Sequence, residues 1–250
     1  MQKLLSIILI INYFCQFIAS AQSPKGMKDR NATIEEARYL KSIYKTEDAI
    51  ELLSGLISPG QSDEEVQNEL ADCYIQAGDL DAAASTYSTL LQMKPESILY
   101  RIKLMLTTYR SKDYKSSSEL GLSIIKRDTI PAIVSLTADS FNMMAMPDSA
   151  LIYYNMYIGM NPANPSVVSK AAKIHLERKE YVKVLDMAED YLQIASTNMG
   201  IRGLKGLAYF LMEDFNSSED VFQKMKDDGN DSYSVHLYLG QNQWRNKEYI

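Results

Sequence analysis

Apolar residues between Glu64 and Ser97 recur every three or four positions, which predicts two successive amphipathic helices. The apolar face of the first helix consists of Leu70, Cys73, Tyr74 and Ala77. The apolar face of the second helix consists of Ala83, Tyr87, Leu90 and Leu91. Gly78-Asp79 separates the two faces, since glycine ends helices and aspartate caps the helix that follows. Pro95 has no amide hydrogen to donate, so it ends the second helix.

The same pair of helices returns along most of the chain at a step close to 34 residues. The predicted units are 30–63, 64–97, 98–130, 131–164, 165–198, 199–232 and a partial unit, 233–250. Each second helix has one position that is small in most units, filled by Ala49, Ala83, Ser117, Ala150, Val184 and Ser218. Small residues there let two helices approach closely, near the short end of the usual 8–10 Å range.

Capping signals predict where several of these helices begin. Thr33 with Glu36 forms a capping box that predicts the start of the first helix, and Ser62 with Glu65 forms another. Residues 22–29, which include Pro24 and Gly26, are predicted to be a flexible lead-in. Pro147 and Pro165 fall at first-turn positions, where proline is tolerated.

The clear unit resembles the tetratricopeptide repeat family. The resemblance is carried by Leu70-Ala71-x-x-Tyr74, Gly78-Asp79, Ala83-x-x-x-Tyr87 and Pro95, while Gln67 stands where the family has tryptophan. It implies an all-α protein, an α-solenoid in which stacked helix-turn-helix units coil into a right-handed superhelix with a concave groove. It also implies that the first helix of each unit lines that groove.

By the family frame, thirteen residues are candidate partner-binding positions in the groove. They are Asn68, Asp72, Gln76, Ile102, Leu106, Tyr109, Asp139, Asn142, Lys173, Leu207, Phe210, Gln241 and Trp244. The apolar members Leu106, Tyr109, Leu207 and Phe210 suit the core between repeats equally well, so both interpretations stay open. Chaperone-binding members of the family hold a terminal carboxylate with lysines and asparagines. Their nearest counterparts here, Arg38, Asn68 and Lys103, do not form that set.

The first 21 residues have the pattern of a secretory signal peptide. Lys3 precedes a mostly apolar run, and Ala19-Ser20-Ala21 is a small-x-small cleavage site, so the mature chain is predicted to begin at Gln22. Asn12 and Gln16 interrupt a run already shorter than the ~20 residues of a membrane span. We therefore expect an exported protein, periplasmic, associated with the cell envelope or secreted, with no membrane span after cleavage.

The net charge bears on the possible ligands, and the cysteine content bears on disulfide bonds. The 250 residues carry a net charge of −6, and no predicted helix has a basic stripe, which argues against nucleic acid and anionic membranes as ligands. Cys73 is the only cysteine left once Cys15 leaves with the leader, so an intramolecular disulfide is excluded in the mature chain.

The residues of typical catalytic and metal sites do not occur together. His175 and His236 stand nearly two units apart, and no carboxylate is placed to serve both. The chain has no H-E-x-x-H, no paired C-x-x-C and no glycine-rich phosphate loop, and residues 227–231 lack the spacing of a calcium loop. We therefore predict no enzyme activity, no cofactor and no metal, and expect Cys73 to be buried.

These patterns favour a non-catalytic scaffold or assembly factor that binds a protein or peptide in the concave groove, in an extracytoplasmic compartment. The alternative is an N-terminal sensing or regulatory segment of a longer protein whose output domain lies beyond Ile250. Glu248-Tyr249 matches Glu180-Tyr181, which begins a second helix, so we expect the repeats to continue past Ile250. The rival interpretation is that residues 232–250 form a single capping helix.

Overall fold

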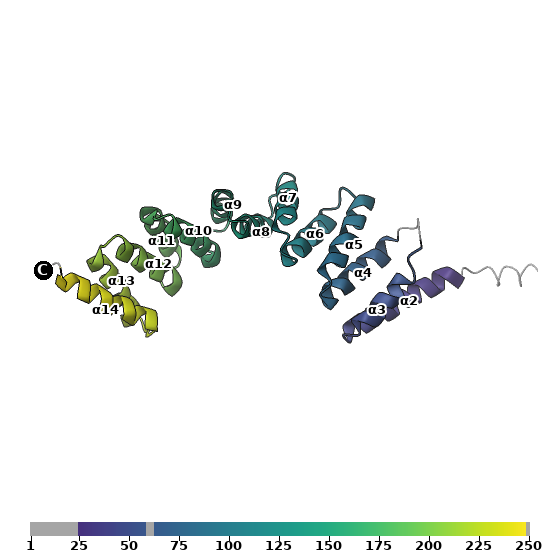
Figure 1. The fold of residues 1–250 in the computed structure, drawn as a ribbon, viewed down its shortest axis with the longest axis horizontal. Coiled ribbons are helices and arrows are strands. Elements are labelled where there is room, and N and C mark those ends of the chain that lie inside the picture. The colour runs from purple at the N-terminus through teal and green to yellow at the C-terminus, as the bar shows by residue number, and fades with distance from the viewer. Residues whose placement is uncertain (1–24, 59–62, 249–250) are drawn as a thin grey trace, which may run out of the picture. The chain divides into compact units, whose positions relative to one another are not determined.

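The computed structural model describes residues 25–58 and 63–248, and every regular element in these two ranges is an α-helix (Figure 1). The predicted all-α class is confirmed. The predicted signal peptide, residues 1–21, lies outside the described residues, as do Tyr249 and Ile250. The helices are α2 (Lys25–Ser42), α3 (Thr46–Ser54), α4 (Glu64–Ala77), α5 (Leu80–Met93), α6 (Ile98–Arg110), α7 (Tyr114–Ile125), α8 (Pro131–Met143), α9 (Pro147–Met160), α10 (Pro165–Glu177), α11 (Tyr181–Ile194), α12 (Met199–Leu211), α13 (Phe215–Asp227) and α14 (Tyr233–Glu248).

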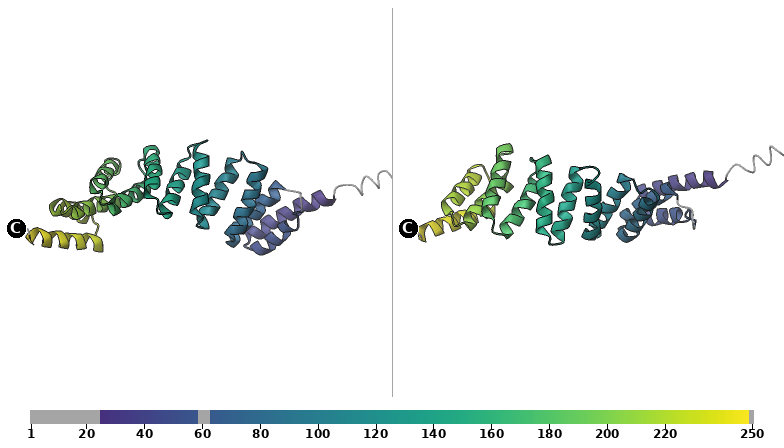
Figure 2. Two further views of the ribbon diagram at one scale, coloured as in Figure 1. Left: turned by 45° about the horizontal axis from the view of Figure 1, so that its top comes forward. Right: turned by 90° about the horizontal axis from the view of Figure 1, so that it is seen from above.

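The chain divides into two compact parts between Thr107 and Thr108, within α6. These parts are called the first and second unit below, and each 34-residue repeat is called a pair of helices. In the first, α2 packs on α3 and α4 packs on α5. In the second, α8 packs on α9, α10 on α11, and α12 on α13, with α14 against α13 (Figure 2). No helix among the described residues is long and apolar enough to cross a membrane.

One residue at a positive φ ends the first helix of every pair. At Gly78 (φ 83°) a glycine takes this conformation at no steric cost, as the sequence predicts. The equivalent positions hold residues with side chains: Tyr44, Lys112, Ala145, Lys179 and Glu213. The next amide then donates to a carbonyl five residues back, as from Asp79 to Tyr74 (2.9 Å), which satisfies an otherwise unpaired carbonyl at the helix end.

The same short turn starts the next helix. Asp79 Oδ1 accepts a hydrogen bond from the amide of Ala82 at 3.0 Å, and Asp113 and Asp214 cap α7 and α13 in the same way. Hydrogen bonds from Ser116 hold the pKa of Asp113 below its ordinary value. A turn of two or three residues therefore closes one helix and caps its partner.

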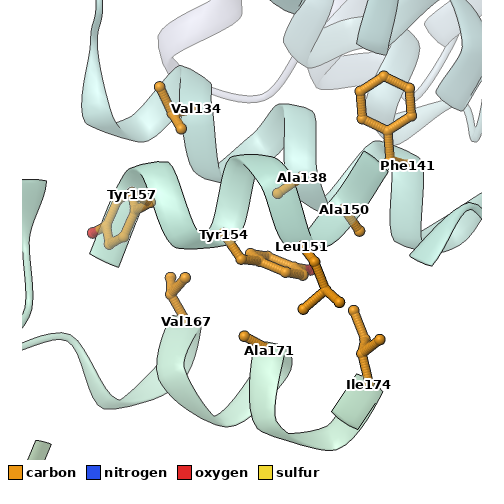
Figure 3. Packing of buried hydrophobic residues seen from close by; sticks show 10 residues of the cluster. All are labelled: Val134, Ala138, Phe141, Ala150, Leu151, Tyr154, Tyr157, Val167, Ala171 and Ile174. Carbon is orange, nitrogen blue, oxygen red and sulfur yellow. The ribbon is translucent and has the colours of Figure 1, made fainter. Parts of the chain in front are cut away.

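The small position of each second helix is fully buried. Ala49, Ala83, Ser117, Ala150, Val184 and Ser218 all have 0% of their surface exposed, which confirms the predicted close packing. Ala150 lies near Ala138 of α8, and the two small side chains let α9 approach α8 (Figure 3). In α9, Tyr154 and Leu151 point towards Ala171 and Ile174 of α10, so the core of one pair continues into the next (Figure 3).

The first helix begins earlier than predicted, at Lys25 rather than at Thr33, so residues 25–29 are helical and not part of a flexible lead-in. Long-range ion pairs account for the difference. Arg30 Nε lies 2.5 Å from Asp63 Oδ2 and its Nη2 lies 2.9 Å from Glu65, which ties this part of α2 to the start of α4. The N-cap of α4 is Asp63, because its Oδ1 accepts the amides of Glu65 and Val66, while the predicted cap, Ser62, lies outside the described residues.

The last helix also differs from its predicted length. α14 continues through Glu248, where the frame predicts a turn before Tyr249. The position that turns to positive φ in α10 and α12, Lys179 and Glu213, corresponds here to Lys247. In the earlier pairs the helix that follows packs back and holds this residue in the turn, whereas the described residues include no helix after α14.

Candidate protein-binding faces on the first helices

All thirteen predicted groove residues lie on the first helices of their pairs. In the first unit these are Asn68, Asp72 and Gln76 of α4, with Ile102 and Leu106 of α6. In the second they are Tyr109 of α6, Asp139 and Asn142 of α8, Lys173 of α10, Leu207 and Phe210 of α12, and Gln241 and Trp244 of α14. Their chemistry differs between the two units.

In the first unit, Asn68 and Asp72 are engaged by a lysine from the next pair. Lys103 Nζ lies 2.9 Å from Asn68 Oδ1 and 3.0 Å from Asp72 Oδ1. Asp72 also accepts a hydrogen bond from the hydroxyl of Tyr87. Burial and this bond to Asp72 raise the pKa of Tyr87 well above its usual range. The carboxylate of Asp72 thus already has a lysine and a tyrosine as partners within the fold.

A second ion cluster on the same unit centres on Glu69, which the sequence analysis missed. Arg38 Nε and Lys41 Nζ lie 2.8 and 2.6 Å from its two carboxylate oxygens. Burial acts to raise the pKa of Glu69, but the hydrogen bonds from Lys41 and Arg38 outweigh it and the pKa is lowered. The spacing of the residues could have predicted this pair. Glu69 follows Arg38 by 31 positions, and Lys103 follows Asp72 by the same number.

In the second unit Asp139 repeats the arrangement of Asp72. Lys170 Nζ lies 2.8 and 2.7 Å from its two carboxylate oxygens, and the hydroxyl of Tyr154 donates to it at 2.6 Å. Burial, then this hydrogen bond, raises the pKa of Tyr154. Both acidic residues of the predicted groove set, Asp72 and Asp139, therefore join neighbouring pairs of helices.

The other predicted residues of α4, α6, α8 and α10 share no common environment. Gln76 donates from Nε2 to the carbonyl of Lys41 at 3.2 Å, and the ring of Tyr109 meets that of Tyr114 edge to face at 5.4 Å. The others in this group range from half-buried to exposed, and they are Ile102, Leu106, Asn142 and Lys173.

An apolar pocket of about 360 Å³ opens between α12, α13 and α14, and it includes Leu207 from the predicted set. Phe210 lies beside it, with its ring 5.6 Å from Phe215 and 5.2 Å from Tyr238, so it belongs to the packing between pairs. The pocket is lined by Met199, Gly200, Gly203, Leu204, Leu207, Phe222, Met225, Asn230, Ser234 and Tyr238.

Two glycines that the sequence analysis did not single out create this space. A Cβ atom built at Gly203 would meet only Met225 Cε, at 3.8 Å, and one at Gly200 would meet Asn198 Oδ1 at 3.4 Å. Serines occupy the equivalent positions of α10, Ser166 and Ser169. The pocket therefore exposes helix backbone and apolar side chains together, a surface that suits an apolar side chain of a peptide.

On α14, Trp244 is 56% exposed and Gln241 is also exposed. The guanidinium of Arg245 lies 4.9 Å from the ring centre of Trp244.

The histidines and the cysteine are used in the fold. His175 is buried, with Nδ1 2.6 Å from Glu180, and His236 Nε2 lies 2.5 Å from Asp231. Cys73 is buried, as expected, and burial raises the pKa of its thiol. Within residues 25–58 and 63–248, no three His, Cys, Asp or Glu residues come together as metal ligands would.

Comparison with known proteins agrees with these features. Residues 44–105 match the family described as Tetratricopeptide repeat. A search of curated proteins finds no matching relative.

Solved structures extend the likeness over more of the chain, at the level of fold. A chain of the Naa15/Naa10 complex bound to HypK-THB aligns with 91% of this chain at a TM-score of 0.66 and 16% identity, and this chain spans 35% of its length. MamA aligns with 66% of this chain and 90% of its own (TM-score 0.59, 18% identity). PilF of Pseudomonas aeruginosa aligns with 86% of this chain over 99% of its own length (TM-score 0.53, 17% identity). Residues 44–105 therefore match the tetratricopeptide repeat family, and most of the chain shares the helical fold of these solved structures.

Proposed function

We propose that this protein is a non-catalytic binding scaffold that holds a partner protein through an apolar side chain inserted in the pocket of α12, α13 and α14. The observation that carries the proposal is the exposed backbone at Gly200 and Gly203 beside Leu207. The family match over residues 44–105 supports the class of function, because tetratricopeptide repeats are generally protein-binding and non-catalytic.

The size and chemistry of the pocket favour a peptide over a charged ligand. Its volume of about 360 Å³ lies at the lower end of the range of ligand sites, ~300–1,000 Å³, and suits one large side chain. Its lining is apolar apart from Asn230 and Ser234. An extended segment can approach the glycines closely while it places a leucine or an aromatic ring against Leu207.

The carboxylates of the other first helices make weaker candidates for peptide recognition. Asp72 and Asp139 each already pair with a lysine and a tyrosine. Ligand binding there would have to break these contacts, which stabilise the stacking of neighbouring pairs. The pocket requires no such rearrangement.

Peptide selection followed by a matched pair of variants tests the proposal. Random peptides are selected on the chain from Gln22 to Ile250, and the affinity of the best binder is measured by fluorescence anisotropy. Gly203→Leu fills the pocket and is expected to weaken binding at least ~10-fold, the equivalent of about 1.4 kcal/mol. Ser135→Leu adds a leucine at the same repeat position of α8 and is expected to leave binding unchanged.

The proposal fails if both variants bind the selected peptides as the original chain does, or if only Ser135→Leu weakens them. Circular dichroism of each variant checks that the helices are retained. Selected peptides are also expected to share a large apolar residue, whereas enrichment of purely charged peptides would argue for a different face.

We also propose that the scaffold acts outside the cytoplasm, in the periplasm, at the cell envelope or in the secreted fraction. The support is the sequence of residues 1–21, with Lys3, an apolar run and Ala19-Ser20-Ala21. Intact-mass analysis of the protein from its native host is expected to give a chain that begins at Gln22. A mature protein that retains Lys3 would overturn the export proposal and leave the pocket proposal untouched.

A further inference from the structure

A second pocket of the second unit, of about 210 Å³, lies between α9, α10 and α11, and we call it the Val168 pocket. Its lining includes the buried residues Val168 and Tyr191 and the half-buried Met187. Pro162 and Asp190 also line it, and both are exposed. Because its volume is below the ~300 Å³ at which sites for whole small ligands begin, the pocket suits a single side chain.

Two other pairs of helices have an arginine where this pair has Val168. Val168 is the fourth residue of α10, and Arg101 and Arg202 are the fourth residues of α6 and α12. Arg101 Nη2 donates to the carbonyl of Pro95 at 2.6 Å, and Arg202 Nε donates to the carbonyl of Ser196 at 2.7 Å. Each carbonyl belongs to the turn before the helix that carries the arginine, six positions earlier in the chain.

The arginine of α12 shows in detail how this position holds a guanidinium group. The Arg202 side chain is only 12% exposed, and it pairs with Asp228, which directly follows α13. The surroundings of Arg202 therefore cover most of the side chain and give its guanidinium both a carbonyl and a carboxylate. A guanidinium group suits such a site, because its several N–H donors are fixed in one plane.

The Val168 pocket has counterparts of these acceptors but no arginine. Pro162 lies six positions before Val168, in the turn before α10, so its carbonyl corresponds to those that accept the arginines of α6 and α12. Asp190 of α11 supplies a carboxylate, one helical turn before the position that corresponds to Asp228. Among residues 25–58 and 63–248, none forms an ion pair with Asp190. The space that an arginine fills in two other pairs is therefore open here.

The pocket depends on the neighbours of Val168 as well as on the valine itself. Val134 is the fourth residue of α8, and it belongs to a core cluster against which Tyr153 packs. In the pair of α10 and α11 the position of Tyr153 is taken by Met187, which lines the pocket. A valine on the first helix and a smaller residue on the second thus occur together at this pocket.

We propose that the Val168 pocket binds an arginine side chain of a partner protein, whose guanidinium donates to Asp190 and to the carbonyl of Pro162. The occupant is inferred from the chain's own arginines, which fill the same position of α6 and α12. The net charge of −6 also favours the approach of a basic segment. The two pockets share no lining residue, so this inference does not depend on peptide binding at α12, α13 and α14.

A methyl NMR titration of the chain from Gln22 to Ile250 tests the inference. The probe is the blocked tripeptide Ala-Arg-Ala, and the control peptide has citrulline, which is uncharged and nearly the same shape, in place of arginine. The arginine peptide is expected to shift the methyl signals of Ile158 and Met187 until they saturate. The citrulline peptide is expected to bind at least ~10-fold more weakly, because hydrogen bonds between charged groups are the stronger ones.

Two variants locate the site. Val168→Arg supplies the arginine from the chain itself and is expected to abolish binding with the helices retained, because Arg101 and Arg202 are accommodated at this position. Asp190→Asn keeps the shape of the pocket and is expected to weaken binding of the arginine peptide at least ~10-fold. Asp220→Asn removes an exposed carboxylate of α13 outside the pocket and is expected to leave binding unchanged.

The inference is overturned if the arginine peptide causes no saturable shift in the original chain, or if the citrulline peptide binds equally well. Equal binding to Asp190→Asn and Asp220→Asn would also overturn it, and this comparison holds even if Val168→Arg fails to fold. Tighter binding of the peptide Ala-Trp-Ala than of Ala-Arg-Ala would assign the pocket to an aromatic side chain and reject arginine. These results leave the proposal for the pocket of α12, α13 and α14 untouched.

Discussion

At the scale of single residues, the same three-residue contact occurs twice. Asp72 and Asp139 each accept a hydrogen bond from a tyrosine 15 positions later and from a lysine 31 positions later. The family frame placed both aspartates on first helices, where the structure has them. It could not reveal their partners, because the tyrosine and the lysine lie on two other helices and single-helix patterns carry no information on such pairing.

Removing one hydroxyl measures the strength of this contact. Tyr154→Phe keeps the buried ring but removes the donor to Asp139, and we expect a loss of about 1 kcal/mol in the free energy of unfolding. Tyr44→Phe, at a tyrosine that is 83% exposed, serves as the control and should change stability little. Urea denaturation followed by circular dichroism measures both, and equal values for the two variants would contradict this role of Tyr154.

A second residue-scale prediction concerns Gly206. A methyl group there would come within 2.7 Å of the Phe222 ring, which is only 2% exposed and cannot move freely. We expect Gly206→Ala to destabilise the protein by ~1–3 kcal/mol, although alanine normally favours helix. Gly159→Ala, with open space around it, should be neutral or stabilising. A stable Gly206→Ala variant would show that α12 and α13 are not held as described.

At the scale of elements, the turns were partly predictable. Gly78 and the capping Asp79 were recognised, because glycine and aspartate have local preferences for these positions. The five other positive-φ residues were not, because Tyr44, Lys112, Ala145, Lys179 and Glu213 adopt this conformation only where packing of the next helix requires it. The early start of α2 was missed for a related reason, since Arg30 is held by Asp63 across two helices.

Glycine at one of these turns should stabilise the protein. Ala145 has a φ of 55°, which costs an L-residue roughly 1 kcal/mol more than glycine. We therefore expect Ala145→Gly to raise the free energy of unfolding by up to ~1 kcal/mol. The same substitution in the middle of α5, Ala84→Gly, should lower it by a similar amount. Thermal melts that showed both variants destabilised would contradict the turn conformation.

At the scale of the whole molecule, the first unit depends on ionised carboxylates. Hydrogen bonds from Arg30 lower the pKa of Asp63, and a hydrogen bond from Lys94 lowers the pKa of Glu64. For Glu69, burial opposes ionisation but the bonds from Lys41 and Arg38 prevail and lower its pKa from 4.5. A lowered folded-state pKa means that the stabilisation is complete above the ordinary value and is lost as the pH falls below it.

We therefore expect the melting temperature to be nearly constant from pH 7 to about pH 5 and to fall steadily below pH 4.5, the ordinary value of Glu69. Glu69→Gln should lower the melting temperature at pH 7 and make it less dependent on pH in the acid range. Differential scanning calorimetry at several pH values measures both. An unchanged acid slope in Glu69→Gln would show that the ion pairs with Arg38 and Lys41 contribute nothing.

The repeat architecture was readable from the sequence at this scale, but the site was not. Apolar periodicity recurs in every pair and a small residue in most of them, so they identify the fold. Of the predicted groove residues, Leu207 lies in the α12, α13 and α14 pocket, while Asp72 and Asp139 are engaged between pairs. Which face stays available to a partner depends on side-chain pairing between repeats, which the sequence does not show. Likewise, only the structure shows that Gly200 and Gly203 leave space for a pocket.

Hydrogen–deuterium exchange with and without a selected peptide tests whether the partner binds at α12, α13 and α14. Binding is predicted to slow amide exchange in residues 199–238, around Gly203 and Leu207, and to leave α4 and α8 unchanged. Slowed exchange confined to α4 and α6, around Asp72 and Lys103, or no slowing between residues 199 and 238, would show that the peptide does not bind in this pocket.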